Sequence, residues 1–79
     1  MARFTMRIHL HHVTAVGHGH TRSTAMWAAL GQYAIHSEGK HAKTAHSMAV
    51  TARSASRGGH AEVKWRVGEG PDWVEIERC

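Results

Sequence analysis

Nine histidines are the side chains of this 79-residue chain that are most able to do chemistry. His9, His11 and His12 form one cluster, and His18 and His20 form another on a glycine-containing segment. Two imidazoles at positions i and i+2 of a strand share a face and can chelate a metal ion. The clusters have no cysteine ligand and no carboxylate close by in sequence, and their spacing is not that of a known metal-binding family. We therefore expect exposed polar histidines, no bound metal and no other cofactor.

Catalytic motifs are absent from the sequence. There is no serine in a Gly-x-Ser-x-Gly turn, no phosphate-binding glycine loop and no Cys-x-x-Cys pair. Five of the six acidic residues follow residue 61, where an alternating pattern predicts paired strands, so cross-strand ion pairs explain them. A chain of this length also buries only a thin core, which leaves little material for a deep cleft. We expect a non-enzymatic protein that works by binding.

Basic side chains are concentrated in the body of the chain. Residues 1–61 carry seven lysines or arginines and one acidic residue, whereas residues 62–79 carry three basic and five acidic residues. This distribution predicts an anionic partner for the basic body. Arg53 and Arg57 are four residues apart on a predicted helix and share a face, and with Lys40 and Lys43 they are candidates for a basic patch. The alternative is an ordinary solvated helix face.

The sequence predicts a single small domain over residues 1–79 in the cytosol. No apolar run approaches the ~18 residues of a membrane span, so no membrane partner is expected. The charged first residues are not followed by an apolar block, so no secretory signal is predicted. The only cysteine is Cys79, which excludes an internal disulfide.

The first part of the chain is predicted to contain a strand, a loop and a helix. Apolar and polar residues alternate from Phe4 to His11, so residues 3–14 are expected to form one half-buried strand. Two glycines in residues 16–21 indicate a loop, and Ser23 or Thr24 is the expected N-cap of the helix that follows. The apolar stripe expected on that helix consists of Met26, Trp27, Leu30, Tyr33 and Ala34.

Residues 32–46 fit two structures. The first helix can continue to Ser37. Alternatively, it ends at Gly31 and is followed by strands at residues 32–38 and 41–46, because Tyr33 and Ile35 also alternate with their neighbours. The pattern does not separate the two.

A second helix is predicted over residues 47–57. Ser47 is its expected N-cap, and Gly58-Gly59 is its expected stop because glycine takes the left-handed C-terminal position without steric cost. Its apolar stripe is small and consists of Met48, Ala49, Ala52 and Ala55. Such a stripe allows a helix to lie close against a sheet.

The C-terminal segment is predicted to be a β-hairpin. Residues 61–67 and 73–78 alternate between apolar and charged side chains, and residues 68–72 form a five-residue turn. The expected register places Val67 opposite Asp72, Trp65 opposite Val74, Val63 opposite Ile76, Arg66 opposite Trp73 and Lys64 opposite Glu75. The whole pattern predicts an α+β fold, with an antiparallel sheet of three or four strands packed against one or two helices.

The three tryptophans suggest different roles. Trp27 and Trp65 lie on apolar faces and are expected in the core. Trp73 lies on the polar face of the hairpin unless a bulge turns it inward, and there Arg66 can stack on its indole. An exposed tryptophan is typical of interface hot spots. The candidate partner-binding residues are therefore Lys40, Lys43, Arg53, Arg57, Trp73, Arg66 and Arg7, and the next choice is the exposed face of the first strand, with Arg7, His9 and His11.

In build, the chain resembles the small anti-CRISPR proteins that phages encode. Those compact α+β proteins pair an alanine-rich helix with an antiparallel sheet and a tryptophan-bearing terminal hairpin, and the matching segments here are residues 47–57 and 61–77, about a third of the chain. The resemblance implies a stoichiometric inhibitor in the bacterial cytoplasm that docks on a CRISPR effector, a protein complex, and blocks DNA or nuclease access. Because this chain is basic, it would address an acidic protein surface or the nucleic acid held in the effector.

Two other functions fit the sequence. One is a small basic nucleic-acid-binding or regulatory domain, and the other is a structural or assembly component of a phage particle. No helix-turn-helix, zinc-finger or RNA-recognition signature is present, so nucleic-acid binding would act through general charge.

Overall fold

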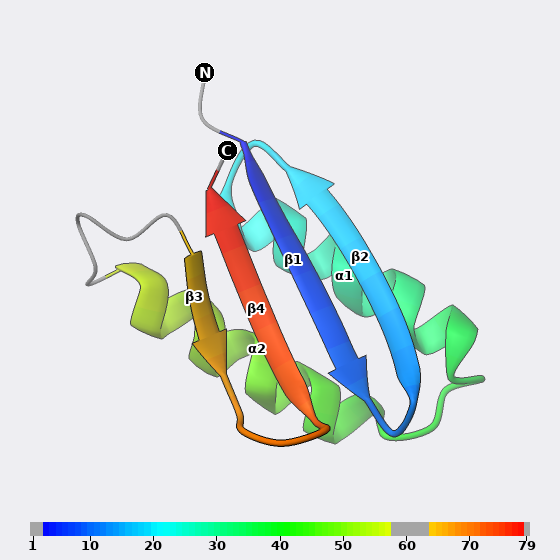
Figure 1. Ribbon diagram of the computed structural model, residues 1–79. Coiled ribbons are helices and arrows are strands. Elements are labelled where there is room, and N and C mark those ends of the chain that lie inside the picture. The colour runs from blue at the N-terminus through cyan, green and yellow to red at the C-terminus, as the bar shows by residue number, and fades with distance from the viewer. Residues whose placement is uncertain (1–2, 58–63, 79) are drawn as a thin grey trace.

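The computed structural model describes residues 3–57 and 64–78. Within these residues, two helices cover one face of a four-stranded antiparallel sheet (Figure 1). The strands are β1 (Phe4–Leu10), β2 (Val13–Gly19), β3 (Lys64–Val67) and β4 (Trp73–Arg78), in the order β2-β1-β4-β3, and the helices are α1 (Arg22–His36) and α2 (Ala42–Arg57). The arrangement confirms the predicted α+β class with its C-terminal hairpin.

The prediction of one strand over residues 3–14 is wrong, because the chain reverses at His11 and His12. Both residues have positive φ, 50° and 65°, which is the backbone of the two-residue turn that matches the twist of a hairpin. Leu10 pairs with Val13, and β1 runs antiparallel to β2 from there. Such turns favour Asn-Gly, so a His-His pair carries no turn signal in the sequence.

The predicted loop at residues 16–21 is also wrong in most of its length, since β2 continues to Gly19. The two glycines serve a close approach of α1 rather than a turn. A Cβ at Gly17 would lie 2.6 Å from the carbonyl oxygen of Ala25 and closer still to the amide nitrogen of Ala29. A Cβ at Gly19 would lie 2.6 Å from the amide nitrogen of Ala25. The backbone of α1 therefore lies directly on β2.

Helix α1 begins with a capping box at Thr21, and not with the predicted cap at Ser23 or Thr24. The backbone N–H of Thr24 donates to Thr21 Oγ1 (3.1 Å), and the backbone N–H of Thr21 donates to Thr24 Oγ1 (3.0 Å). The helix then continues to His36, which confirms the helical alternative and excludes the hairpin there. Its buried residues are Ala25, Met26, Ala29 and Tyr33. The prediction that Trp27 belongs to the core is wrong, because this residue is 57% exposed.

Helix α2 begins at Ala42, five residues before the predicted N-cap at Ser47. Its buried residues are all small: Ala45, Ala49, Ala52 and Ser56. The predicted small-residue stripe is therefore correct in kind, although Met48 and Ala55 are only half-buried. The predicted stop at Gly58-Gly59 lies outside the described residues.

Strands β3 and β4 form the predicted hairpin in a register that is shifted by two residues. The observed pairs are Val67 with Val74, Arg66 with Glu75, Trp65 with Ile76 and Lys64 with Glu77. Gly68 and Gly70 both have positive φ, and they open a wider loop than the predicted pairing of Val67 with Asp72 allows. Because strand side chains repeat every two residues, the shift leaves each side chain on its predicted face. The predicted position of Val63 lies outside the described residues.

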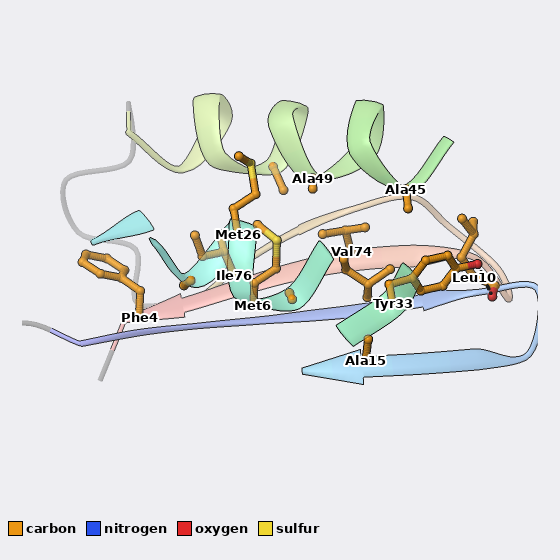
Figure 2. Packing of buried hydrophobic residues seen from close by; sticks show 14 residues of the cluster. Phe4, Met6, Leu10, Ala15, Met26, Tyr33, Ala45, Ala49, Val74 and Ile76 are labelled. Atoms are coloured by element: carbon orange, nitrogen blue, oxygen red, sulfur yellow. Dashed lines mark hydrogen bonds between the residues drawn. The ribbon is translucent and has the colours of Figure 1, made fainter. Parts of the chain in front are cut away.

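The core lies between the sheet and the helices. The side chains of Met6, Val74 and Ile76 point from the two central strands towards the helices (Figure 2). Tyr33 of α1 lies beside Leu10 at one end of this layer (Figure 2). Trp65 packs on the core from the edge but is only half-buried. Since alternate residues of each strand face the helices, the remaining residues form a second sheet surface.

Candidate functional site

The open face is the side of the sheet that faces away from the two helices (Figure 1). Burial of Phe4, Met6, Ile8 and Leu10 under the helices turns the alternating residues of β1 to this side, and the strand pairing aligns their neighbours with them. The open face consists of Thr5, Arg7 and His9 of β1, Thr14, Val16 and His18 of β2, Lys64 and Arg66 of β3, and Trp73, Glu75 and Glu77 of β4.

Three planar side chains stack in a row across the open face. His9 pairs with Trp73 in the sheet register, and their ring centroids are 5.4 Å apart with an angle of 28° between the planes. The guanidinium carbon of Arg66 lies 4.4 Å from the centroid of the Trp73 ring, which is a cation–π contact. Because β4 lies between β1 and β3, the indole stands between the imidazole and the guanidinium. We call these three residues the stacked row.

Backbone and side-chain hydrogen bonds hold the stacked row in place. The Nδ1 atom of His9 is 2.7 Å from the carbonyl oxygen of Pro71, in the loop before β4. Arg66 donates from Nε and Nη2 to Glu75 Oε2, at 3.3 and 3.2 Å. The three side chains of the stacked row are therefore already ordered in the unbound protein. A partner that contacts them does not incur the entropic cost of immobilising them.

Glu75 is the centre of the charge network on the open face. It is only 5% exposed, although it lies on the side away from the helices. Its carboxylate oxygens lie 3.2 Å from Arg66 Nη2, 3.5 Å from Arg7 Nη1 and 3.8 Å from Lys64 Nζ. Arg7 Nη1 also donates to Glu77 Oε1 at 3.0 Å. The three cations screen the Glu75 carboxylate from solvent and are themselves partly neutralised.

Three of the predicted binding residues, Arg7, Arg66 and Trp73, come together on the open face. The stacking of Arg66 on Trp73 was expected from a direct cross-strand pair, but Arg66 pairs with Glu75 and reaches Trp73 along the diagonal. Trp73 is half-buried on the polar side, so the predicted outward orientation is correct and the inward bulge is not formed.

The predicted basic patch of Lys40, Lys43, Arg53 and Arg57 does not form as one surface. Lys43 lies in the first turn of α2, and Arg53 and Arg57 lie in its last turns, ten or more residues and so about 15 Å or more away. Arg53 donates from Nη1 to Ser23 Oγ at 3.2 Å, which ties α2 to α1. Lys40 lies in the turn before α2 and is exposed, as are Lys43 and Arg57.

The sequence does not indicate that Arg22, the first residue of α1, contacts the last turn of α2. Arg22 donates from Nε to Ser56 Oγ at 3.1 Å, and its guanidinium carbon lies 4.7 Å from the ring centroid of Phe4. Arg22 and Arg53 therefore hold the helices to each other and to the sheet. No local signal in the sequence distinguishes these two arginines from those at the surface.

The histidine clusters do not converge. His11 stacks on His41 of the α1–α2 connection, with ring centroids 3.6 Å apart, whereas Nδ1 of His18 is 2.9 Å from Thr5 Oγ1. In the part of the chain that the structure describes, no group of three or more His, Cys, Asp or Glu residues is placed to hold a metal ion. Among the same residues, no helix is long and apolar enough to cross a membrane.

Comparisons with protein-family models, with curated proteins and with solved structures found no match to this chain.

Proposed function

We propose that this chain is a non-enzymatic, stoichiometric inhibitor that docks on a protein partner through its open face. The observation that carries the proposal is the stacked row of His9, Trp73 and Arg66. Tryptophan and arginine are the side chains most enriched in interface hot spots. Here both are held in a fixed geometry before binding, which lowers the entropic cost of forming an interface.

The geometry of the stacked row favours a protein over a nucleic acid. A base stacks on a free aromatic face, but the Trp73 indole lies between His9 and Arg66. The carboxylates of Glu75 and Glu77 also lie among the cations of the open face and would repel phosphates. A protein surface that offers both signs of charge complements such a mixed surface better.

The resemblance in build to the small anti-CRISPR proteins supplies the first partner to test. On this proposal, the chain acts in the bacterial cytoplasm and occupies a surface of a CRISPR effector complex that DNA or a nuclease needs. The basic side chains at the rim of the open face speed association, whereas the stacked row slows dissociation.

The test compares two tryptophans on different sides of the molecule. Trp73→Ala removes the centre of the stacked row, and Trp27→Ala removes a tryptophan of the helical side. Each variant is added to purified guide-loaded effector complexes, and binding and DNA cleavage are measured. We expect wild type and Trp27→Ala to inhibit at one copy per effector, and Trp73→Ala to lose about 2 kcal/mol of affinity, through a faster off-rate.

Circular dichroism must show that both variants are folded. Arg57→Glu is a second control, because Arg57 lies at the far end of α2 and away from the open face. Arg53→Glu is not suitable, since Arg53 bonds to Ser23 between the helices. Equal loss of binding in Trp27→Ala and Trp73→Ala would contradict docking through the open face. Binding to bare DNA that collapses between low and moderate salt would replace the proposal with nucleic-acid binding.

A further inference from the structure

A groove runs between α1 and α2, on the helical side of the molecule. Its volume is about 400 Å³, and its walls are the apolar parts of Trp27, Leu30, Tyr33, Ala34, Ala42 and Ala45. We call it the helix groove. Pockets that hold small ligands have volumes of roughly 300–1,000 Å³ and are lined mainly by apolar and aromatic side chains. The helix groove fits both criteria.

The mouth of the helix groove exposes more apolar surface than the fold requires. Trp27 is 57% exposed, and its only described aromatic contact is a tilted one with His46, at 5.6 Å between ring centroids. Residues 23–35 contain no charged side chain, so the outer side of α1 is uncharged along most of its length. The charged outer face that a surface helix usually carries is missing here. The exposed part of the Trp27 indole at the mouth of an apolar groove is available to a ligand that enters the groove.

The polar residues at the helix groove specify the charge of its occupant. Lys43 and His46 of α2 line the rim, and both are exposed. Among the described residues that line the groove, none is acidic. The Lys43 ammonium therefore has no counter-ion in the groove itself, and a ligand with an apolar body and a negative head complements the site.

A second copy of the chain fits the helix groove poorly. A symmetric dimer through this surface buries the same patch of both copies, with residue i of one copy against residue j of the other. Such an interface would contain two Lys43 ammonium groups, and the residues that line the groove include no acidic side chain to pair with either. Charge complementarity thus favours an anionic ligand over self-association.

We propose that the helix groove binds a small amphipathic carboxylate. The apolar body lies against Trp27 and Leu30, and the carboxylate lies at Lys43. This site is separate from the open face, so the proposal does not depend on the proposed inhibitor function.

Decanoate and decanol form a matched pair of probes, because they share a ten-carbon chain and differ in charge. Each is titrated into the full chain below the concentration at which decanoate forms micelles, and binding is followed by calorimetry and by amide and indole NMR signals. We expect saturable one-to-one binding of decanoate, with shifts at the Trp27 indole and at Ala34 and Ala42. Decanol should bind about fivefold more weakly, as expected for one exposed charge contact.

Two pairs of variants separate the apolar and the charged contributions. Trp27→Ala should weaken both probes about tenfold, because it removes apolar contact area. Its control is Ile35→Ala, which removes another exposed apolar side chain of α1 (69% exposed) outside the groove lining. Lys43→Gln should abolish the preference for decanoate over decanol, whereas its neighbour Lys40→Gln should retain it.

The proposal fails if decanoate does not bind saturably, or if wild type binds decanol as tightly as decanoate. It also fails if the NMR shifts concentrate at Trp73 on the open face, or if the preference for decanoate survives in Lys43→Gln. The side chains of Trp27 and Lys43 are exposed, so both variants are expected to fold, and their amide spectra verify this directly.

Discussion

The hydroxyl of Tyr33 donates a hydrogen bond of 3.0 Å to the carbonyl oxygen of Leu10, the last residue of β1. Tyr33 is 1% exposed, so this bond joins α1 to the end of a central strand inside the core. The contact links the helix to the strand directly before the His11-His12 turn. Removing the hydroxyl would leave the buried carbonyl oxygen of Leu10 without this hydrogen bond. An unpaired buried polar group destabilises the folded state more than the loss of a solvent-exposed hydrogen bond does.

Tyr33→Phe should therefore lower the free energy of unfolding by about 1–2 kcal/mol. Phenylalanine retains the ring and its packing, so the change isolates the hydroxyl. Urea unfolding measures the effect, and the slope against urea should remain that of the wild type. An unchanged midpoint would mean that the Tyr33 hydroxyl is hydrated rather than bonded to Leu10.

The same hydroxyl predicts a loss of stability in alkali. Burial raises the pKa of Tyr33 above its ordinary value of 10.0, and the negative charge of Asp72 raises it further. The folded protein therefore retains the phenol proton at a pH where the unfolded chain releases it. This contribution to stability is complete below pH 10.0 and is lost as the pH rises through the higher pKa of the folded state.

Tyr33→Phe supplies the control for this pH dependence. The difference in free energy of unfolding between wild type and variant should be constant below pH 10.0 and should fall above it. Lysine titration affects both proteins and cancels in the difference. A difference that stays constant above pH 10.0 would show that the pKa of Tyr33 is the same in the folded and unfolded chain.

A pair of glycine substitutions tests the close approach of α1 to β2. Gly17→Ala would place a Cβ within 2.6 Å of backbone atoms of Ala25 and Ala28, and backbone cannot swing aside as a side chain can. We expect a loss of about 3 kcal/mol. Gly31→Ala, in the middle of α1 with nothing within 4 Å, should instead stabilise the protein by about 1 kcal/mol. Thermal unfolding of the two variants should shift in opposite directions, and a stabilised Gly17→Ala would disprove the contact.

The faces of the strands could be predicted from the sequence, whereas the points where the chain reverses could not. The alternation of apolar and charged residues predicts that Trp73 and Arg66 lie on the polar side of the hairpin, and this is correct. The predicted register is wrong by two residues, but a shift of two residues leaves each side chain on the same face of the sheet. The sequence does not indicate the turn at His11 and His12, because the pairs that mark such a turn are Asn-Gly, Asp-Gly and Gly-Gly. Histidine takes positive φ more often than most residues, but much less often than glycine.

The candidate site could be predicted only in part, because its members meet through tertiary pairing. Arg7 meets Glu75 since β1 and β4 are neighbours in the sheet, and 68 positions separate the two residues in sequence. The sequence predicts a loop at Gly17 and Gly19, because the close approach of α1 that requires these glycines exists only in the folded protein. The apolar neighbours of Trp27 predict a core position, although the helix turns this side chain to solvent.

The charge network of the open face depends on the negative charge of Glu75. Glu75→Gln keeps the shape of the side chain but removes the negative charge that lies among Arg7, Lys64 and Arg66. The three cations then repel one another without a central counter-charge. Breaking a fully buried ion pair costs roughly 3–5 kcal/mol, but these cations are partly exposed, so we expect a loss of about 2 kcal/mol.

Glu77→Gln is the matched control, since Glu77 lies two residues further along β4, is more exposed and contacts only Arg7 among the described cations, at 3.0 Å. It should cost less than about 1 kcal/mol. Added salt screens the repulsion among the three cations, so the deficit of Glu75→Gln should shrink as the sodium chloride concentration rises. Urea unfolding of both variants at low and high salt measures these effects. If Glu77→Gln destabilised the protein as much as Glu75→Gln, the buried carboxylate would not be the centre of the network. In that case the hydrogen bonds from Arg66 to Glu75 would not be what holds the guanidinium over the Trp73 ring.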